Sequence, residues 1–511
     1  MYSKIYSAVN IGLDSKLVEV ETDLKDGFPR FDILGLGDKA IEEAKGRVRS
    51  AIINSNFSFP ARKKIIVNLA PADIKKEGTS YDLPLAVGIL LSSEQIDPVL
   101  IKEKTLFVGE LSLEGKLRHT KGILPMAILA KKLGIKNIFL PETNRVEASL
   151  VNGLNIYPLE SLKDFLLHLS GEKIIKPFHP LELEKEPEYQ NDFEDIKGQE
   201  TAKRALKIVA AGGHNLLMIG PPGSGKTLLA QAIPSILPPM AKEEILEVSK
   251  IYSIAGLLNE KEYLKKTRPF RSPHHTISDI AMVGGSANPR PGEISLAHRG
   301  VLFLDEFSEF SRSALESLRQ PLENGYITIS RAKNSINYPA EFILVAAQNP
   351  CPCGWYGDRE KQCICSSGKI IQYRKKISGP LLDRIDLHLE VPRLKFKEIS
   401  TKKKQESSAE IRKKVERARK IQKERFKKEK RKIFTNAEMS PKDLEKFCPI
   451  NQEGEKLLKA AIDQFALSGR AYHRILKVAR TIADLEEQEK ITSKHLAEAI
   501  SYRVKLEEGL I

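Results

Sequence analysis

The sequence contains no long apolar run, no apolar N-terminal segment and few cysteines. In its 511 residues no stretch of about eighteen consecutive apolar residues occurs, which is the least that a membrane-spanning helix needs. The first residues, Met1 to Ile5, do not form an apolar signal region. We therefore expect a cytoplasmic protein with no membrane partner. Five cysteines in a chain of this length exclude a disulfide framework.

The composition is that of a globular protein with a local excess of positive charge. Apolar residues make up 41% and charged residues 29% of the chain, and its length predicts about three domains. The formal net charge is +15, and residues 401 to 432 contribute sixteen Lys or Arg against five Glu. Such a segment is typical of proteins that bind a phosphate backbone, although a solvated lysine-rich helix gives the same pattern. Helical spacing predicts an amphipathic helix with an apolar face formed by Ile411, Val415, Ala418 and Ile421.

The chain is organised around a loop that matches the phosphate-binding pattern G-x-x-x-x-G-K-[ST] in full. Its residues are Gly220, Pro221, Pro222, Gly223, Ser224, Gly225, Lys226 and Thr227. Apolar residues 215–219 predict a strand before the loop and residues 228–233 a helix after it, which argues against a chance match in a glycine-rich turn. Glycines let backbone N–H groups approach phosphate oxygens, Lys226 adds a positive charge, and the Thr227 hydroxyl can bind Mg²⁺. We therefore predict a site for ATP and Mg²⁺.

Two carboxylates follow a second apolar run, residues 301–304. Asp305 is placed to hold the Mg²⁺ ion, and Glu306 is placed to orient and polarise the attacking water. Two acidic residues after a buried strand can instead cap the following helix. Their pairing with the phosphate-binding loop favours the catalytic interpretation.

Residues 1 to 170 alternate strand-like and helix-like segments and predict a separate α/β domain. Two stretches, 107–116 and 134–144, resemble segments of the proteolytic domain of Lon in the same order. Where the Lon family carries its nucleophilic serine this chain has Leu85, and where it carries the lysine this chain has Leu124. A Ser-Lys dyad requires a hydroxyl and an amine, and leucine supplies neither. The resemblance implies a Lon-like, ribosomal-S5-like scaffold or binding module that is not a peptidase. One predicted helix of this domain has apolar residues at Ile41, Ala44, Val48, Ala51 and Ile52.

The ATPase region begins after a linker. Residues 171–191 are rich in Pro and Glu and lack periodicity, so we expect them to separate two folding units. The adjacent His274 and His275 would point to opposite faces of a strand and bind one metal ion poorly. A hairpin is predicted within residues 326–338, and Arg331 and Lys333 at its tip are candidate contacts for a DNA backbone threaded through a ring. A plain surface hairpin is the alternative.

A further strand-like run ends at Asn349, and four cysteines follow it. In AAA+ enzymes, which this region resembles, the matching asparagine contacts the γ-phosphate and the attacking water. The cysteines are Cys351, Cys353, Cys363 and Cys365. Four thiolates can close a tetrahedral zinc site that stabilises an irregular loop. One intervening residue in each pair is a tight spacing, so reduced cysteines without metal are the alternative.

Two arginines are assigned by resemblance to the magnesium-chelatase and MCM-helicase branch of AAA+ proteins. Residues 378–387 resemble the arginine-finger segment of that branch, which implies that Arg384 reaches the nucleotide of a neighbouring subunit. An ion pair with Asp383 or Asp386 of the same chain is the alternative. Residues 467–485 resemble the lid helix that carries a second sensing arginine. Arg470 matches that residue best, and Arg474 lies one turn further on the same face.

Taken in order, these parts resemble the YifB/ComM family of magnesium-chelatase-like AAA+ ATPases over nearly the whole chain. The resemblance implies an α/β fold with a Lon-like domain (1–170), an AAA+ core (192–395) with a cysteine-rich insert (351–365), and a basic helix with a helical lid (396–511). It implies a hexameric ring that moves on single-stranded or branched DNA as a branch-migration helicase or translocase in recombination or natural transformation. A magnesium-chelatase motor subunit and, less favoured, an ATP-dependent peptidase are the alternatives.

Overall fold

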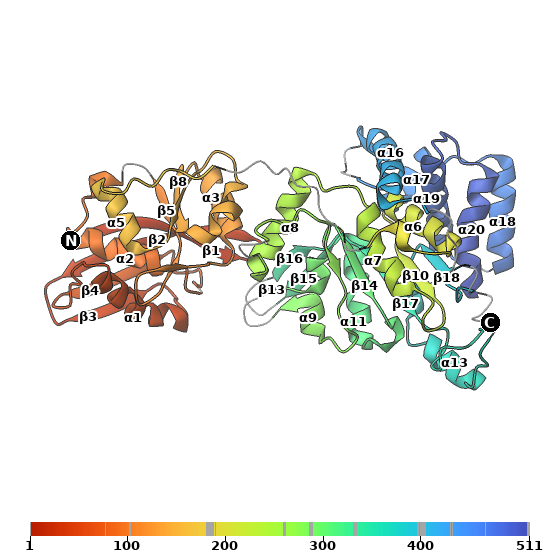
Figure 1. The fold of residues 1–511 in the computed structure, drawn as a ribbon, viewed down its shortest axis with the longest axis horizontal. Helices are drawn as coiled ribbons and strands as arrows, with labels where there is room; N and C mark the ends of the chain where they lie inside the picture. Colours follow the sequence, from red (N-terminus) through yellow and green to blue (C-terminus); the bar gives the residue numbers. More distant parts are fainter. Residues whose placement is uncertain are drawn as a thin grey trace. The chain divides into compact units, whose positions relative to one another are not determined.

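The structure of the protein, a computed structural model, comprises two compact units (Figure 1). Unit 1 consists of Met1–Lys185 together with Lys242–Lys265, and unit 2 consists of Glu186–Ala241 and Lys266–Ile511. Residues described in the structure are 2–76, 78–101, 104–179, 189, 191–258, 262–285, 290–330, 335–358, 360–395, 398, 405–429, 431, 433–465 and 467–507. Of the expected linker, residues 171–191, positions 180–188 and 190 therefore lie outside the described residues.

Unit 1 is built on a seven-stranded sheet with the order β3-β4-β2-β1-β5-β8-β9. Its strands are β1 (Tyr2–Ile11), β2 (Asp14–Lys25), β3 (Arg30–Leu34), β4 (Lys64–Ala70), β5 (Thr105–Phe107), β8 (Asn137–Pro141) and β9 (Asn155–Leu159). The pairs β1–β2 and β2–β4 are antiparallel, and the other neighbouring pairs are parallel. A separate hairpin joins β6 (Glu110–Leu111) to β7 (Leu117–Arg118), and its turn includes Gly115 with a φ of +85°.

The helices of unit 1 bury their apolar residues. They are α1 (Lys39–Asn54), α2 (Asp82–Ser92), α3 (Ile123–Lys132), α4 (Arg145–Ser149) and α5 (Leu162–Ser170). α1 begins after Asp38, whose carboxylate accepts a hydrogen bond from the backbone N–H of Ile41 at 3.0 Å. The residues that α1 buries are the five whose helical spacing predicts it: Ile41, Ala44, Val48, Ala51 and Ile52. Every residue of α2 is buried, which fits its apolar character on all faces.

One helix of unit 1 comes from the middle of the sequence. α8 (Lys242–Ala255) lies between two elements of unit 2 in the chain, yet it belongs to unit 1 and packs against α3. The backbone N–H of Gly122 donates to the carbonyl oxygen of Ser253 at 3.1 Å. The hydroxyl of Ser253 donates to the carboxylate of the buried Glu147. The expected ATPase core, residues 192–395, is therefore interrupted by an insert that folds with the N-terminal residues.

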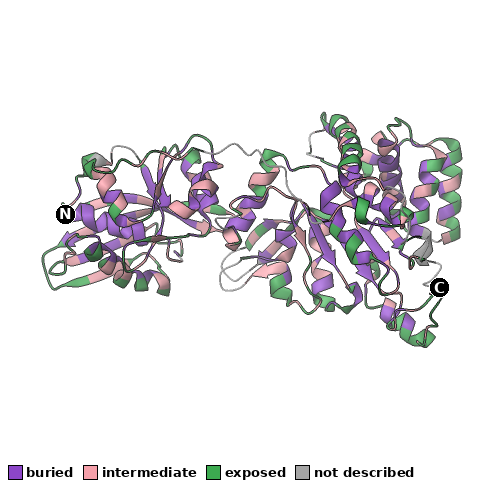
Figure 2. Ribbon diagram, viewed as in Figure 1, coloured by how far each residue is buried: buried purple, intermediate pink, exposed green. Residues whose placement is uncertain are grey.

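Unit 2 is built on a five-stranded parallel sheet with the order β11-β14-β17-β10-β18. Its strands are β10 (Leu216–Ile219), β11 (Phe270–Arg271), β14 (Val301–Leu304), β17 (Ile343–Gln348) and β18 (Leu387–Glu390). All residues of β14 and β17 are buried, as Figure 2 shows in purple. Parallel strands that are covered on both faces read as continuous apolar runs, and this is why the sequence predicts them.

The remaining elements between the strands of unit 2 are mostly short. They are α6 (Glu200–Gly212), α7 (Lys226–Ile236), α9 (Asp279–Val283), β12 (Gly284–Gly285), β13 (Arg290–Pro291), α10 (Glu293–Leu296), α11 (Arg312–Ser317), α12 (Arg319–Asn324), β15 (Tyr326–Ser330), β16 (Ser335–Pro339), α13 (Ser367–Arg374) and α14 (Gly379–Leu382). β15 and β16 pair antiparallel and confirm the predicted hairpin. Its tip, with Arg331 and Lys333, lies outside the described residues.

The C-terminal part of unit 2 is helical. It comprises α16 (Ser408–Phe426), α17 (Pro441–Phe447), α18 (Gln452–Phe465), α19 (Gly469–Leu485) and α20 (Ser493–Glu507). A capping box of Ser407 and Glu410 begins α16, which packs against α6, α7 and α19. Of the predicted apolar face, Ile411, Val415 and Ala418 are buried, and Ile421 is half-buried. These helices share one apolar core with the parallel sheet.

Candidate nucleotide-binding site

The candidate site lies where the parallel strands of unit 2 reach their carboxyl ends. The chain leaves β10 through the phosphate-binding loop, residues 220–227, and continues as α7. β17 and β18 flank β10 on its two sides. In an open parallel sheet, ligands bind at the carboxyl ends of strands where neighbouring connections diverge. The backbone N–H of Gly220 donates to the carbonyl oxygen of Gln348 at 3.2 Å, which ties the loop to the end of β17.

Three glycines allow the loop to follow this path. Gly223 and Gly225 have φ angles of +74° and +88°, in a region that glycine adopts at little cost. A methyl group at Gly220 would lie 2.2 Å from the carbonyl oxygen of Val391, which is too close for any side chain. α7 begins at Lys226, so the positive end of its dipole and its first N–H groups are directed at the loop. The loop is therefore shaped to receive an anion.

Lys226 is held inside the loop, with 8% of its surface exposed. Its Nζ donates to the carbonyl oxygens of Gly220 at 2.8 Å and Pro221 at 3.0 Å. Burial lowers the pKa of Lys226, and the charge of Asp305 partly opposes this effect. An ammonium group that has lost most of its water gains strongly from an anionic ligand. A nucleotide phosphate is such a ligand.

Thr227 and Asp305 form a pair of oxygen ligands at the mouth of the loop. The hydroxyl of Thr227 donates to Oδ2 of Asp305 at 2.8 Å. Oδ1 of Asp305 accepts the backbone N–H of Glu306 at 2.9 Å. Mg²⁺ prefers oxygen ligands and usually binds one or two protein oxygens, several waters and nucleotide phosphates. This donor set fits Mg²⁺ bound together with a triphosphate.

Glu306 is paired with a histidine that the sequence interpretation did not connect to it. Oε2 of Glu306 lies 2.9 Å from Nδ1 of His275, and the Glu306 side chain is 54% exposed. Glu306 has a φ of +51°, which non-glycine residues seldom adopt and which is frequent at functional sites. The sequence predicted His274 and His275 only as a poor metal site. The available signal was that the histidines follow β11, because β11 and β14 are neighbours and their carboxyl ends meet.

Asn349 completes the polar groups around the loop. It follows β17 directly, is half-buried, and its Oδ1 accepts a hydrogen bond from Nζ of Lys226 at 3.4 Å. The ammonium, hydroxyl, carboxylate and amide groups that the sequence singled out thus lie at the ends of β10, β14 and β17. Such a constellation can bind a triphosphate and orient a water molecule for attack on it.

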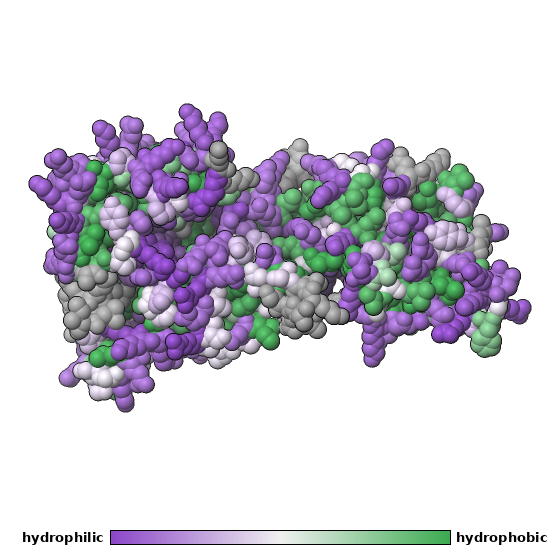
Figure 3. Space-filling model, turned by 180° about the vertical axis from the view of Figure 1, so that it is seen from behind, coloured by the Kyte–Doolittle hydropathy of each residue, from purple (hydrophilic) through white to green (hydrophobic). Residues whose placement is uncertain are grey.

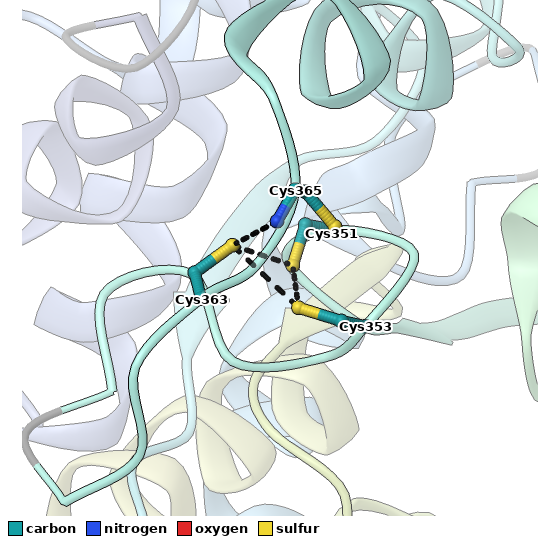
Figure 4. Close-up of side chains that lie close together, drawn as sticks. All are labelled: Cys351, Cys353, Cys363 and Cys365. Atoms are coloured by element: carbon teal, nitrogen blue, oxygen red, sulfur yellow. Dashed lines mark hydrogen bonds between the residues drawn. The ribbon is translucent and has the colours of Figure 1, made fainter.

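The four clustered cysteines converge in the loop that follows Asn349 (Figure 4). Their sulfur atoms all lie within 4.8 Å of one another. Sγ of Cys351 is 3.4 Å from Cys353 and 3.7 Å from Cys363, and Cys353 is 3.5 Å from Cys363. Zinc–sulfur bonds of about 2.3 Å in a tetrahedron place the sulfurs ~3.8 Å apart, so these distances suit a zinc ion. Within the described residues no other cluster of His, Cys, Asp and Glu side chains is this compact.

Arg384 is folded back within its own chain. It is 4% exposed, donates to the carbonyl oxygen of Pro380 and pairs with Glu323 of α12. Burial, and then the positive charges of Arg470 and other arginines, lower the pKa of Arg384. Its partner in the chain is therefore Glu323 and not Asp383 or Asp386. No sequence pattern indicates this pair, because the two residues are 61 positions apart.

The structure separates the two candidate sensing arginines of α19. Arg474 pairs with Asp386, which is fully buried. Burial alone would raise the pKa of Asp386, but Arg474 and His214 hold the pKa of this carboxyl well below its usual range. Arg470 is exposed, and among the described residues its side chain has no ion pair.

The positions that correspond to a Lon dyad are apolar and closed. Leu85 and Leu124 are fully buried in α2 and α3. The backbone N–H of Leu124 donates to Glu147 at 3.0 Å, and the amide of Asn144 donates to the same carboxylate at 3.0 Å. Burial raises the pKa of Glu147. Neither leucine position supplies a nucleophile or a base for peptide hydrolysis.

The positively charged side chains of α16 form two groups, one that binds neighbouring helices and one that is exposed to solvent. Arg412 and Arg419 donate to the carbonyl oxygens of Ser235 and Ala210, so they fasten α16 to α7 and α6. The exposed cations of α16 and of the two residues that follow it are mostly lysines: Lys413, Lys414, Lys420, Lys423, Lys427 and Lys428. Figure 3 shows hydrophilic side chains over much of the face of the molecule that it presents. Among the described helices, none combines the length and the apolar character that crossing a bilayer demands.

Three family models match successive parts of the chain. The family model "Magnesium chelatase, subunit ChlI" matches residues 192–399, "Subunit ChlI of Mg-chelatase" matches 20–144, and "Magnesium chelatase, subunit ChlI C-terminal" matches 405–503. The magnesium-chelatase 38 kDa subunit of Rhodobacter capsulatus is 29% identical over 175 residues, which cover 31% of this chain and 50% of that protein.

Two relatives match over almost their full length. Competence protein ComM of Haemophilus influenzae is 45% identical over 505 residues, covering 98% of this chain and 97% of that protein. Protein YifB of Escherichia coli is 43% identical over 502 residues, covering 98% and 97%. The chain therefore belongs to the YifB/ComM family of magnesium-chelatase-like AAA+ ATPases.

Proposed function

We propose that the protein is a cytoplasmic, ring-forming motor that hydrolyses ATP and acts on DNA, as a branch-migration helicase or translocase. The observation that carries the ATPase part is the meeting of Lys226, Thr227, Asp305 and Asn349 at the ends of neighbouring parallel strands. The DNA part is supported by the exposed lysines of α16 and by the name of one relative, a competence protein.

Each polar group of the site has a role in this proposal. Lys226 and the loop N–H groups bind the phosphates, while Thr227 and Asp305 hold Mg²⁺. Bound Mg²⁺ neutralises charge on the phosphate oxygens. Glu306 accepts a proton from the attacking water, and Asn349 orients that water beside the outermost phosphate.

Arg384 is proposed to act on the nucleotide of a neighbouring subunit, with Arg470 as the second sensing residue. A guanidinium stabilises negative charge on the transferred phosphoryl group only if it reaches that group. Arg384 would have to leave Glu323 to do so. Hence the proposal requires an oligomer, a hexamer by resemblance. Light scattering that finds a monomer at every concentration, with and without ATP, would contradict it.

A mixing experiment tests the action of Arg384 in a neighbouring subunit. Arg384→Ala alone and Lys226→Ala alone are each expected to hydrolyse ATP poorly. Mixed in equal amounts, they should recover part of the turnover, because a subunit with Lys226 can receive Arg384 from a subunit that has it. Arg312→Ala, an exposed arginine of α11, is the control and should behave as the unchanged protein. Mixtures without any recovery would place the action of Arg384 within its own chain.

The DNA part is tested by stimulation of ATP hydrolysis. We expect single-stranded or branched DNA to raise the rate, and the triple variant Lys413→Glu/Lys420→Glu/Lys427→Glu to reduce this stimulation about tenfold or more, since lost phosphate contacts weaken binding and flatten its salt dependence. The control carries the same charge change on other exposed lysines, Lys442→Glu/Lys456→Glu/Lys459→Glu. Equal stimulation of both variants by DNA would show that α16 is not part of the DNA interface.

The DNA-stimulation assay and a casein-cleavage assay together separate the alternative functions. A magnesium-chelatase motor subunit would show no stimulation by DNA. The similarity to the magnesium-chelatase 38 kDa subunit of Rhodobacter capsulatus extends over only 31% of this chain. An ATP-dependent peptidase would cleave casein, which Leu85 and Leu124 argue against.

Cys351, Cys353, Cys363 and Cys365 are proposed to bind one structural zinc ion. The support is the spacing of their sulfurs and the backbone N–H groups that donate to two of them. The N–H of Tyr356 lies 3.3 Å from Sγ of Cys351, and that of Cys365 lies 3.4 Å from Sγ of Cys363. Such hydrogen bonds commonly support metal-bound thiolates.

A further inference from the structure

The cysteine cluster lies in the chain segment that begins at the nucleotide site. Asn349, which directly follows β17, contacts Lys226, and the fully buried Cys351 is two residues further along the chain. The backbone N–H of Gly354 donates to the carbonyl oxygen of Cys351 at 2.9 Å, so the first two cysteines sit on one tight turn. Movement of this turn would therefore be transmitted directly to Asn349.

The same turn rests on the phosphate-binding loop. A methyl group built on Gly354 would lie 2.7 Å from Cδ of Pro222 and 3.9 Å from Cγ of Asn349. Gly354 also has a φ of +83°, which favours glycine. The backbone of the cysteine loop is thus in close contact with the second proline of the phosphate-binding loop.

The far side of the cysteine loop is fastened to the end of β18. Two cations lie over the ring of Trp355, with Nζ of Lys361 at 4.4 Å and the guanidinium carbon of Arg393 at 4.6 Å from its centre. Arg393 follows Val391, whose carbonyl oxygen borders Gly220. The cysteine loop is therefore linked to the phosphate-binding loop at two places. Gly354 contacts Pro222 directly, and Trp355 contacts the segment after β18, which borders Gly220.

Beyond Cys365 the chain continues into α13. A side chain just after this helix contacts the segment that follows Glu306. Lys376 pairs with Glu309 at 3.1 Å. Tyr373, near the end of α13, is buried. The ion pair of Lys376 therefore joins the chain just after α13 to the segment after Glu306.

Few apolar contacts hold the described part of this loop together. Ile364 is 87% exposed and Tyr356 is 46% exposed. A loop with so little buried apolar surface needs another source of order, and a bound metal supplies it.

From these contacts we infer that the metal-closed cysteine loop positions Asn349 and the Glu306 segment for hydrolysis, so that loss of the metal slows ATP turnover while ATP still binds. The inference rests on the zinc and ATPase parts of the proposed function. The phosphates are bound by Lys226 and the loop N–H groups, which need no cysteine. Hydrolysis needs Asn349 and Glu306 in place, and small displacements of reacting groups reduce rates strongly.

The test compares zinc content, ATP affinity and turnover in three variants. Elemental analysis of protein purified without chelator should give about one zinc per chain, and Cys365→Ser should lose it. Cys365→Ser should then turn over ATP ~10- to 100-fold more slowly, with the dissociation constant for a fluorescent ATP analogue changed less than about threefold. Cys448→Ala, a buried cysteine outside the cluster, is the control and should keep both zinc and turnover.

Gly354→Ala tests the contact without removing a ligand. It should keep its zinc and still lose turnover, because the new methyl group displaces Pro222 or the turn, and thermal unfolding checks that it remains folded. Zinc-free Cys365→Ser with turnover within twofold of the unchanged protein would overturn the inference and leave the zinc site standing. Active unchanged protein without zinc would overturn the inference and the zinc site together. Zinc-loaded protein without any ATPase activity, with or without DNA, would instead contradict the proposed function.

Discussion

Lys226→Ala is expected to abolish ATP turnover and to weaken ATP binding strongly. The present partners of the buried ammonium group are uncharged: the carbonyl oxygens of Gly220 and Pro221 and, at 3.4 Å, Oδ1 of Asn349. A hydrogen bond to a charged group is worth about 1.5–3 kcal/mol, which is roughly 10- to 150-fold in affinity. Lost stabilisation of the transition state should reduce turnover by a further factor of ~100 or more.

Binding of a fluorescent ATP analogue and release of phosphate measure the two effects of Lys226→Ala. Lys459→Ala, on the exposed face of α18, removes the same charge elsewhere and should change neither. If Lys226→Ala hydrolysed ATP at the normal rate, the phosphate-binding loop would not be the site of hydrolysis.

Glu306→Gln is expected to bind ATP normally and to hydrolyse it about 10²- to 10⁴-fold more slowly, the usual contribution of a general base. The amide keeps the size of the carboxylate, and an amide oxygen can still accept a hydrogen bond from His275, but it cannot take a proton from water. The carboxylate is half-exposed in the structure, so its replacement should cost little stability.

Rapid-quench measurement of phosphate release in Glu306→Gln separates binding from chemistry. Glu445→Gln, an exposed carboxylate of α17, provides the control. Normal turnover in Glu306→Gln would move the base to another residue near the site. Loss of ATP binding would instead mean that Glu306 shapes the site and does not act on water.

The parts of the site that the sequence predicted are those encoded by short, local patterns. The phosphate-binding loop needs glycine at fixed spacings, because Gly223 and Gly225 adopt positive φ angles and Gly220 borders a carbonyl group. Asp305 and Asn349 each end a buried strand, and apolar runs of that kind are visible in the sequence. The convergence of the four cysteines also followed from their spacing, although only the fold brings their sulfurs within reach of one ion.

The features that the sequence did not predict depend on contacts between distant residues. His275 meets Glu306 because their strands are neighbours in the sheet. Glu323 pairs with Arg384, 61 positions away in the sequence, and Asp386 pairs with Arg474, 88 positions away. The sequence also did not predict that α8 folds with unit 1. Its helical pattern indicates an apolar face but not which residues cover that face.

The placement of α8 bears on how this protein can be dissected. A fragment that begins at the ATPase region would retain α8 but lose Asp14, Gly122 and Glu147, which bind its Lys250 and Ser253. In such a fragment the surface of α8 that normally packs on unit 1 would be uncovered. Insolubility or low activity of the fragment would then result from that surface and would not reveal a role of the missing domain. A clean separation has to excise residues 242–265 as well and close the gap with a short linker.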